Sequence, residues 1–135
     1  MALQFSVAVR NARLDAIETA IGTAAVLKIR SGAPPANVAT ADSGTVLATL
    51  SLPSDWMAAA SGGTKAKAGT WEDASADAAG TAAHWRLYAS DGTTAHAQGT
   101  VTATGGGGDL TVDNVSFAAG QTFTVTSFTI TEANS

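Results

Sequence analysis

Apolar residues recur at helical spacing in one part of the chain, close to its N-terminus. The stripe consists of Val7, Leu14, Ile17 and Ile21. Ser6 is a residue type that caps helix N-termini, and Gly22 stands where a C-terminal cap glycine belongs. The pattern predicts a helix over residues 6–21. Because the stripe is narrow, we expect it to pack on one surface, either of its own domain or of a neighbouring chain.

After Gly22 the period shortens to two, and short runs are separated by Gly, Pro and Asp. The expected strands cover residues 24–31, 45–52, 64–71, 82–89, 94–101, 109–113 and 120–132. The clearest hairpin turns at Asp91-Gly92, and residues 72–80 read as an acidic loop. Short strands at this spacing favour an antiparallel sandwich or barrel. We expect a mainly β fold, a two-sheet sandwich of jelly-roll type over residues 23–135, preceded by a helical segment at 1–22.

Composition narrows the possible chemistry. The 135 residues form one domain, and with no cysteine the chain has no disulfide, thiolate zinc site or cysteine nucleophile. After Arg86 every charged residue is acidic, which disfavours nucleic acid as a partner. No apolar run approaches 18 residues, and Arg10 and Arg13 interrupt the start, so we expect neither a membrane partner nor a signal peptide.

Candidate reactive groups form no recognisable constellation. On the predicted hairpin, His84 and His96 lie on opposite faces or about 13 Å apart, so they do not hold one ion. No G-x-S-x-G elbow occurs, and the glycines at 105–108 lead into a strand instead of a helix. We therefore expect no catalytic, cofactor-binding or metal-binding residues.

Two weaker binding hypotheses remain open. Oxygen ligands for calcium could come from Asp109 and Asp113, or from the acids at 72, 73 and 77, although neither spacing matches a dedicated loop and a solvated loop is the favoured interpretation. The tryptophans could stack on a sugar, with core or interface packing as the favoured interpretation. They are Trp56, Trp71 and Trp85.

The whole chain resembles small virion proteins of tailed bacteriophages, of the capsid decoration (cement) type. The likeness is carried by residues 2–18 (ALQFSVAVRNARLDAIE), 28–37 (KIRSGAPPAN), 52–57 (LPSDWM) and the hairpin end at 98–101 (QGTV). It is a general sequence likeness without a diagnostic motif, so it transfers no functional residues.

The resemblance implies a non-enzymatic virion structural protein, made in the cytoplasm of a host bacterium. Its expected partners are the major capsid protein and copies of itself, as a homo-oligomer on the particle that holds the shell against internal pressure. We expect the apolar stripe Val7, Leu14, Ile17 and Ile21 to supply assembly contacts. A tail or fibre module that binds host surface glycans is the alternative, and it predicts exposed aromatic side chains on one concave face.

Overall fold

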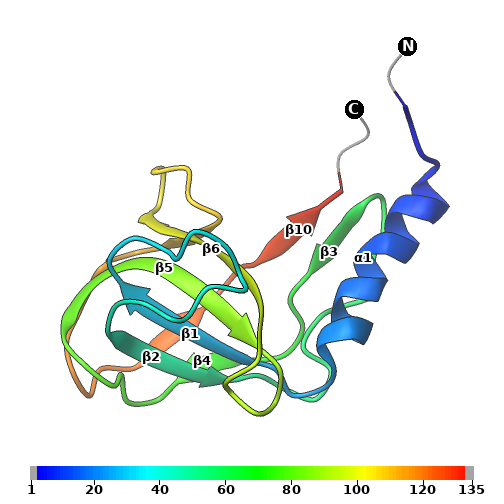
Figure 1. Cartoon of the computed structure of the whole chain (residues 1–135). Coiled ribbons are helices and arrows are strands. Elements are labelled where there is room, and N and C mark those ends of the chain that lie inside the picture. The colour runs from blue at the N-terminus through cyan, green and yellow to red at the C-terminus, as the bar shows by residue number, and fades with distance from the viewer. Residues whose placement is uncertain (1–2, 133–135) are drawn as a thin grey trace.

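The computed structural model describes residues 3–132 and shows a mainly β chain with one helix at its N-terminal end (Figure 1). The helix is α1 (Val7–Ile21). The strands within the described residues are β1 (Val26–Ser31), β2 (Val46–Ser51), β3 (Thr64–Ala66), β4 (Trp71–Asp73), β5 (Gly80–Tyr88), β6 (Ala95–Ala103), β7 (Leu110–Val112), β8 (Ser116–Phe117), β9 (Phe123–Val125) and β10 (Thr129–Thr131). The mainly β class with an N-terminal helix is thus confirmed.

Both ends of α1 follow the sequence signals. The side chain of Ser6 accepts a hydrogen bond from the backbone N–H of Val9, 3.3 Å away, which satisfies one of the unpaired donors of the first turn. Gly22 adopts a φ of 94°, a conformation that favours glycine, and its N–H donates to the carbonyl of Glu18. The helix therefore ends where the chain must turn toward β1.

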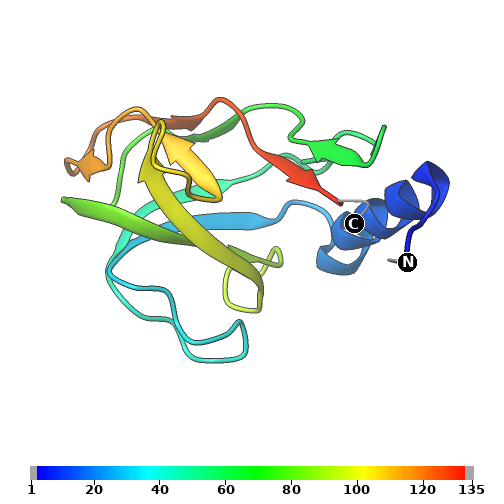
Figure 2. The same ribbon diagram turned by 90° about the horizontal axis from the view of Figure 1, so that it is seen from above.

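The strands form one large sheet and two small pairs. The large sheet has the order β2-β1-β5-β6-β7, with β8 beside the start of β5. Its neighbours are antiparallel except β6 and β7, which are parallel. The pair β4–β9 lies as a second layer over one face of this sheet, whereas β3–β10 continues past the end of the sheet to α1 (Figure 2). The result is a strongly curled, mixed β structure.

The core fills the space between these layers. Along β1 and β5, Leu27 pairs with Leu87 and Ile29 with Trp85, so these side chains share the inner face. The three tryptophans are at most 6% exposed, and rings of two of them pack on Phe128 at centroid distances of 5.3 and 5.5 Å. The favoured interpretation of the tryptophans as packing residues is confirmed, and a sugar platform made from them is wrong because their faces are covered.

Two of the expected strands are broken. The segment expected at 64–71 divides into β3 and β4 around Gly69, whose φ is 69°, and the segment expected at 120–132 divides into β9 and β10. The breaks face each other, because β3 pairs with β10 and β4 with β9. Two adjacent strands that bend together let the layer curl around the core, and an alternating pattern carries no sign of such a bend.

Candidate functional site

A group of exposed apolar side chains marks the N-terminal end of the molecule. We call it the N-terminal apolar surface; it consists of Leu3, Phe5, Val7 and Val9, with exposed fractions of 74, 39, 46 and 42%. Within residues 3–132 these are the large apolar side chains that stay exposed. They lie at the N-terminal end of α1, which is remote from the large sheet (Figure 1). Clustered exposed apolar residues are typical of contact sites for other macromolecules.

The residues of the predicted stripe are divided between two environments. Leu14 is fully buried, Ile21 is 7% exposed and Ile17 packs against the core, so these three contact their own β-domain. Val7 is exposed and remains a predicted assembly contact. The exposed positions 3, 5, 7 and 9 alternate in the sequence, but two residues turn by about 200° around a helix axis, so Val7 and Val9 lie on different sides of α1.

Buried charge holds α1 against β3. The Lys65 side chain is 2% exposed, and its Nζ lies 2.8 Å from Asp15 Oδ1 and 3.0 Å from Glu18 Oε2. It also donates to the carbonyl of Ala58 at 2.8 Å. Burial by itself lowers the pKa of Lys65, but the hydrogen bonds to the two carboxylates outweigh it and the pKa is raised. The ammonium group is therefore charged and held by the helix, an arrangement we call the helix anchor (Asp15, Glu18 and Lys65).

Further contacts extend this attachment along the first half of the helix. Asn11 Oδ1 accepts from the backbone N–H of Gly63 at 2.9 Å. Arg10 donates to the carbonyl of Glu132 at 3.2 Å, and Arg13 forms an ion pair with the Glu132 carboxylate at 2.8 Å. The Arg13 guanidinium also lies 5.2 Å from the centroid of the Phe5 ring. The N-terminal apolar surface thus consists of the start of a helix that is fixed to β3 and to the end of β10, and of the residues just before that helix.

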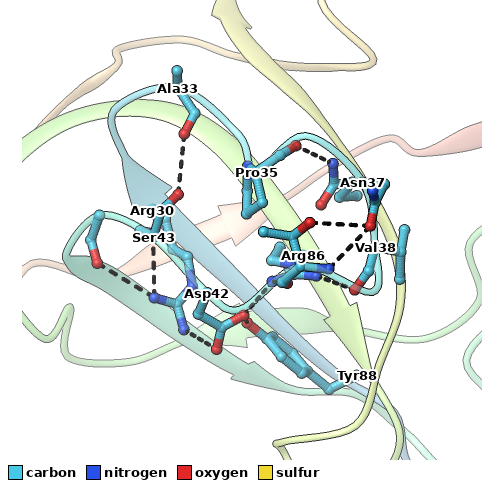
Figure 3. Close-up of polar contacts among 12 residues, drawn as sticks. Arg30, Ala33, Pro35, Asn37, Val38, Asp42, Ser43, Arg86 and Tyr88 are labelled. Carbon is cyan, nitrogen blue, oxygen red and sulfur yellow. Dashed lines mark hydrogen bonds and ion pairs between the residues drawn. The ribbon is translucent and has the colours of Figure 1, made fainter.

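A second polar arrangement lies on the opposite, outer face of the large sheet, beneath the loop of residues 32–45. Arg30 of β1 and Arg86 of β5 both reach Asp42 of this loop, at 2.8 and 2.6 Å (Figure 3). Tyr88 donates its hydroxyl to the same carboxylate at 2.8 Å. We call these residues the arginine cluster (Arg30, Asp42, Arg86 and Tyr88).

The arginine cluster closes the loop onto the sheet. Arg86 also donates to the carbonyls of Val38 and Thr40, and both guanidinium groups are at least nine-tenths buried. Burial raises the pKa of Asp42, but the Tyr88 hydroxyl and the two guanidinium charges lower it more, so its pKa falls below the ordinary value. Burial and the hydrogen bond to Asp42 raise the pKa of Tyr88. The charged side chains of the arginine cluster therefore hold the 32–45 loop against the sheet.

The two histidines lie apart. His84 is fully buried on the face of the arginine cluster, and its Nδ1 is 2.7 Å from the carbonyl of Gly32, whereas His96 is exposed. His84 pairs with Thr100, and the register of the hairpin shifts between Leu87 and Tyr88 because β6 carries one extra residue there, His96. No group of three or more His, Asp or Glu residues within 3–132 is arranged to hold a metal ion.

Four of the five acidic residues considered as calcium ligands accept hydrogen bonds from neighbouring strands, and the fifth, Asp113, is exposed. Asp73 and Asp77 accept from the backbone N–H and the hydroxyl of Thr49 at 2.8 and 2.7 Å. Asp109 accepts from the backbone N–H of Thr100 at 2.9 Å. These carboxylates hold the end of β4 and the residues after it against β2, and the glycine-rich loop against β6; residues 72 and 73, expected in an acidic loop, belong to β4.

The described part of the chain has no helix with the length and apolar content needed to cross a membrane. Comparison of the chain with protein-family models, with curated proteins and with solved structures gave no match.

Proposed function

We propose that this chain is a non-enzymatic structural protein of a bacteriophage virion, which decorates the capsid and stabilises its shell. The observation that carries the proposal is the N-terminal apolar surface, which lies at the start of a helix that is itself fixed by ion pairs to the buried Lys65. A surface of this kind serves contact with other proteins. The sequence resemblance to phage virion proteins supplies the setting, and the partners are the capsid subunit and other copies of this chain.

Attachment through a small surface is sufficient for a protein present in many copies. Four exposed apolar side chains make a modest contact, but a repeated lattice multiplies modest contacts when several are engaged at once. The rigid mounting also lowers the entropy lost on binding, because the helix does not have to be ordered first. A decoration protein would use both effects.

We further propose that the β-domain is a sandwich of jelly-roll type. The two-layer arrangement supports this, since β4–β9 lies over the inner face of the large sheet with the core between them. The parallel contact of β6 with β7 is the feature that a simple antiparallel sandwich does not account for.

Incorporation into particles tests the function. Val7→Asp with Val9→Asp removes half of the apolar surface, and acidic residues in the first turn are favourable for the helix, so the fold is retained. The matched control is Ala8→Asp with Ala12→Asp, which adds the same charge at exposed positions of the same helix. We expect at least tenfold fewer copies of the first variant per purified particle and a normal number of the control.

Equal incorporation of the two variants would contradict the role of the surface. Absence of the wild-type chain from purified particles would contradict the virion assignment. Hundreds of copies per particle support the shell, whereas a few to tens of copies would place the chain in the tail and favour the glycan-binding alternative.

A further inference from the structure

The 32–45 loop is held on the outer face of the large sheet mainly by polar contacts. Besides the arginine cluster, His84 Nδ1 lies 2.7 Å from the carbonyl of Gly32. Gln98 Nε2 donates to the carbonyl of Pro35 at 2.8 Å. Among residues 32–45, Pro35 alone is buried. The loop therefore buries little apolar surface of its own, and water can replace most of the contacts that hold it when the loop lifts.

The closed loop leaves polar atoms beneath it without hydrogen bonds. Within the described residues, this holds for Nε of Arg30 and Arg86, Nε2 of His84 and Oε1 of Gln98, all of them buried. Each of these side chains bonds the loop through another of its atoms. A buried polar atom without a partner destabilises the state that buries it. Lifting the loop returns these atoms to water, so closure depends strongly on the ion pairs of Asp42.

His84 lies between the two arginines. Arg30 is directly opposite His84 in the register of β1 and β5, and Arg86 is two residues further along β5, on the same face. Because the Gly32 carbonyl can only accept, Nδ1 of the neutral ring carries the proton and Nε2 does not. A second proton would create an N–H without an acceptor and a third positive charge above a single carboxylate, that of Asp42.

The other strands beside His84 offer no compensation. From β6, Thr100 lies opposite His84 and Gln98 lies on the same face, and both are uncharged. From β1, Lys28 adds a further positive charge along this face. The negative charge that acts on His84 comes from Asp42 of the loop. Burial, together with the two arginines, keeps the pKa of His84 below its ordinary value while the loop is closed.

We propose that the 32–45 loop is a lid that opens in mild acid, when His84 takes up a proton and the loop leaves the sheet while the β-domain stays folded. Opening uncovers the outer face of the large sheet with Arg30, Arg86 and Tyr88 (Figure 3). The core lies on the other face of this sheet and is not disturbed. The inference goes beyond the proposed function, because it does not involve the N-terminal apolar surface.

Hydroxyl-radical footprinting of the full-length protein at pH 7.5 and 5.5, read by mass spectrometry, tests the lid. Tyr88 is the one tyrosine of the chain; it is fully buried, and its hydroxyl donates to Asp42 of the lid. Trp56 is fully buried in the core and reports unfolding of the domain.

We expect Tyr88 to be oxidised about tenfold faster at pH 5.5. This is the ratio of open populations when the open lid alone takes up the proton, with the ordinary histidine pKa of about 6.5. Trp56 is expected to stay protected at both pH values. Equal rates for Tyr88 at the two pH values, or a parallel increase for Trp56, would overturn the inference without the need for any variant.

Two histidine variants assign the effect, since the chain has only two histidines. His84→Gln is expected to abolish the increase at pH 5.5, whereas His96→Gln, at an exposed position, is expected to retain it. Asp42→Asn is expected to raise Tyr88 oxidation at least tenfold already at pH 7.5, with Trp56 still protected. An increase that persists in His84→Gln, or unchanged protection of Tyr88 in Asp42→Asn, would contradict the lid.

Discussion

Arg86 of β5 and Asp42 of the 32–45 loop form an ion pair 2.6 Å long in which the two partners differ greatly in exposure. The Arg86 side chain is 1% exposed, whereas the Asp42 side chain is 38% exposed. Asp42 also pairs with Arg30, so this partly exposed carboxylate is the counter-charge of two buried guanidinium groups. The arrangement is sensitive to loss of the anion, because the cations cannot turn to solvent while the loop stays closed.

Replacing Asp42 by Asn is expected to destabilise the fold by about 3 kcal/mol, the range found when one partner of a buried ion pair is removed. The amide keeps the shape but leaves Arg30 and Arg86 without a counter-charge. Urea unfolding at pH 7 measures the change. Asp113→Asn, at an exposed position, serves as the control and is expected to change stability by less than about 0.5 kcal/mol. Equal effects of the two substitutions would show that the cluster contributes little.

Because His84 is buried, we expect the protein to lose stability in mild acid. Burial lowers the pKa of His84, the neighbouring charges of Arg30 and Arg86 lower it further, and the hydrogen bond to Gly32 and the charge of Asp42 oppose them. Because the folded pKa lies below the ordinary value of about 6.5, the unfolded chain binds the proton first. The contribution of His84 to the free energy of unfolding is therefore fully present above that value and is lost as the pH falls below it.

The measurement is urea unfolding of the wild type and of His84→Gln at pH 7.5 and 5.5. The glutamine side chain can still donate a hydrogen bond but does not titrate in this range. We expect the wild type to lose more stability than His84→Gln between the two pH values. Parallel losses would assign the acid sensitivity to other groups and contradict the role of His84.

The sequence was informative where a single local signal determines the structure. The caps at Ser6 and Gly22 located the helix, and Asp91-Gly92 located the hairpin, because each signal acts within a few residues. The breaks between β3 and β4 and between β9 and β10 depend on how two strands bend together, which no local pattern records.

The arginine cluster could not be predicted from the sequence for the same reason. Arg30 and Arg86 read as ordinary strand residues, and only the register of β1 and β5 brings them beneath Asp42, far along the chain. Leu14 and Val7 have the same helical phase in the sequence, but Leu14 is buried in the fold and Val7 is exposed. An apolar residue on a predicted stripe does not reveal which chain it will contact.

Removing the charge of Lys65 from the helix anchor is expected to loosen α1. Lys65→Met keeps the buried stem and removes the charge that joins Asp15 and Glu18, so we expect a loss of about 2 kcal/mol and faster hydrogen exchange in α1. Lys67→Met is the matched control, since Lys67 lies two residues away and its Nζ donates to the Gly69 carbonyl. Unchanged exchange in α1 of the Lys65 variant would mean that apolar packing alone holds the helix.

A final prediction compares alanine substitutions at two glycines of the 32–45 loop that have the same backbone conformation. Gly32 and Gly44 have φ values of 77° and 73°, so alanine strains the backbone equally at both positions, by about 1 kcal/mol. The added Cβ meets nothing within 4 Å at Gly32, but at Gly44 it overlaps the carbonyl oxygen of Ser31. The two substitutions therefore differ only in the clash at the base of the loop.

We expect Gly44→Ala to destabilise the fold by about 2 kcal/mol more than Gly32→Ala, in line with the cost of overpacking a closed site. Urea unfolding of both variants provides the comparison. The Gly44 carbonyl also accepts from Arg30 at 3.4 Å, so moving the backbone to relieve the clash weakens the arginine cluster. Combined with Asp42→Asn, Gly44→Ala should then cost less than the sum of the two single losses, because both substitutions open the same loop. Strictly additive losses would show that Gly44 and the cluster act independently.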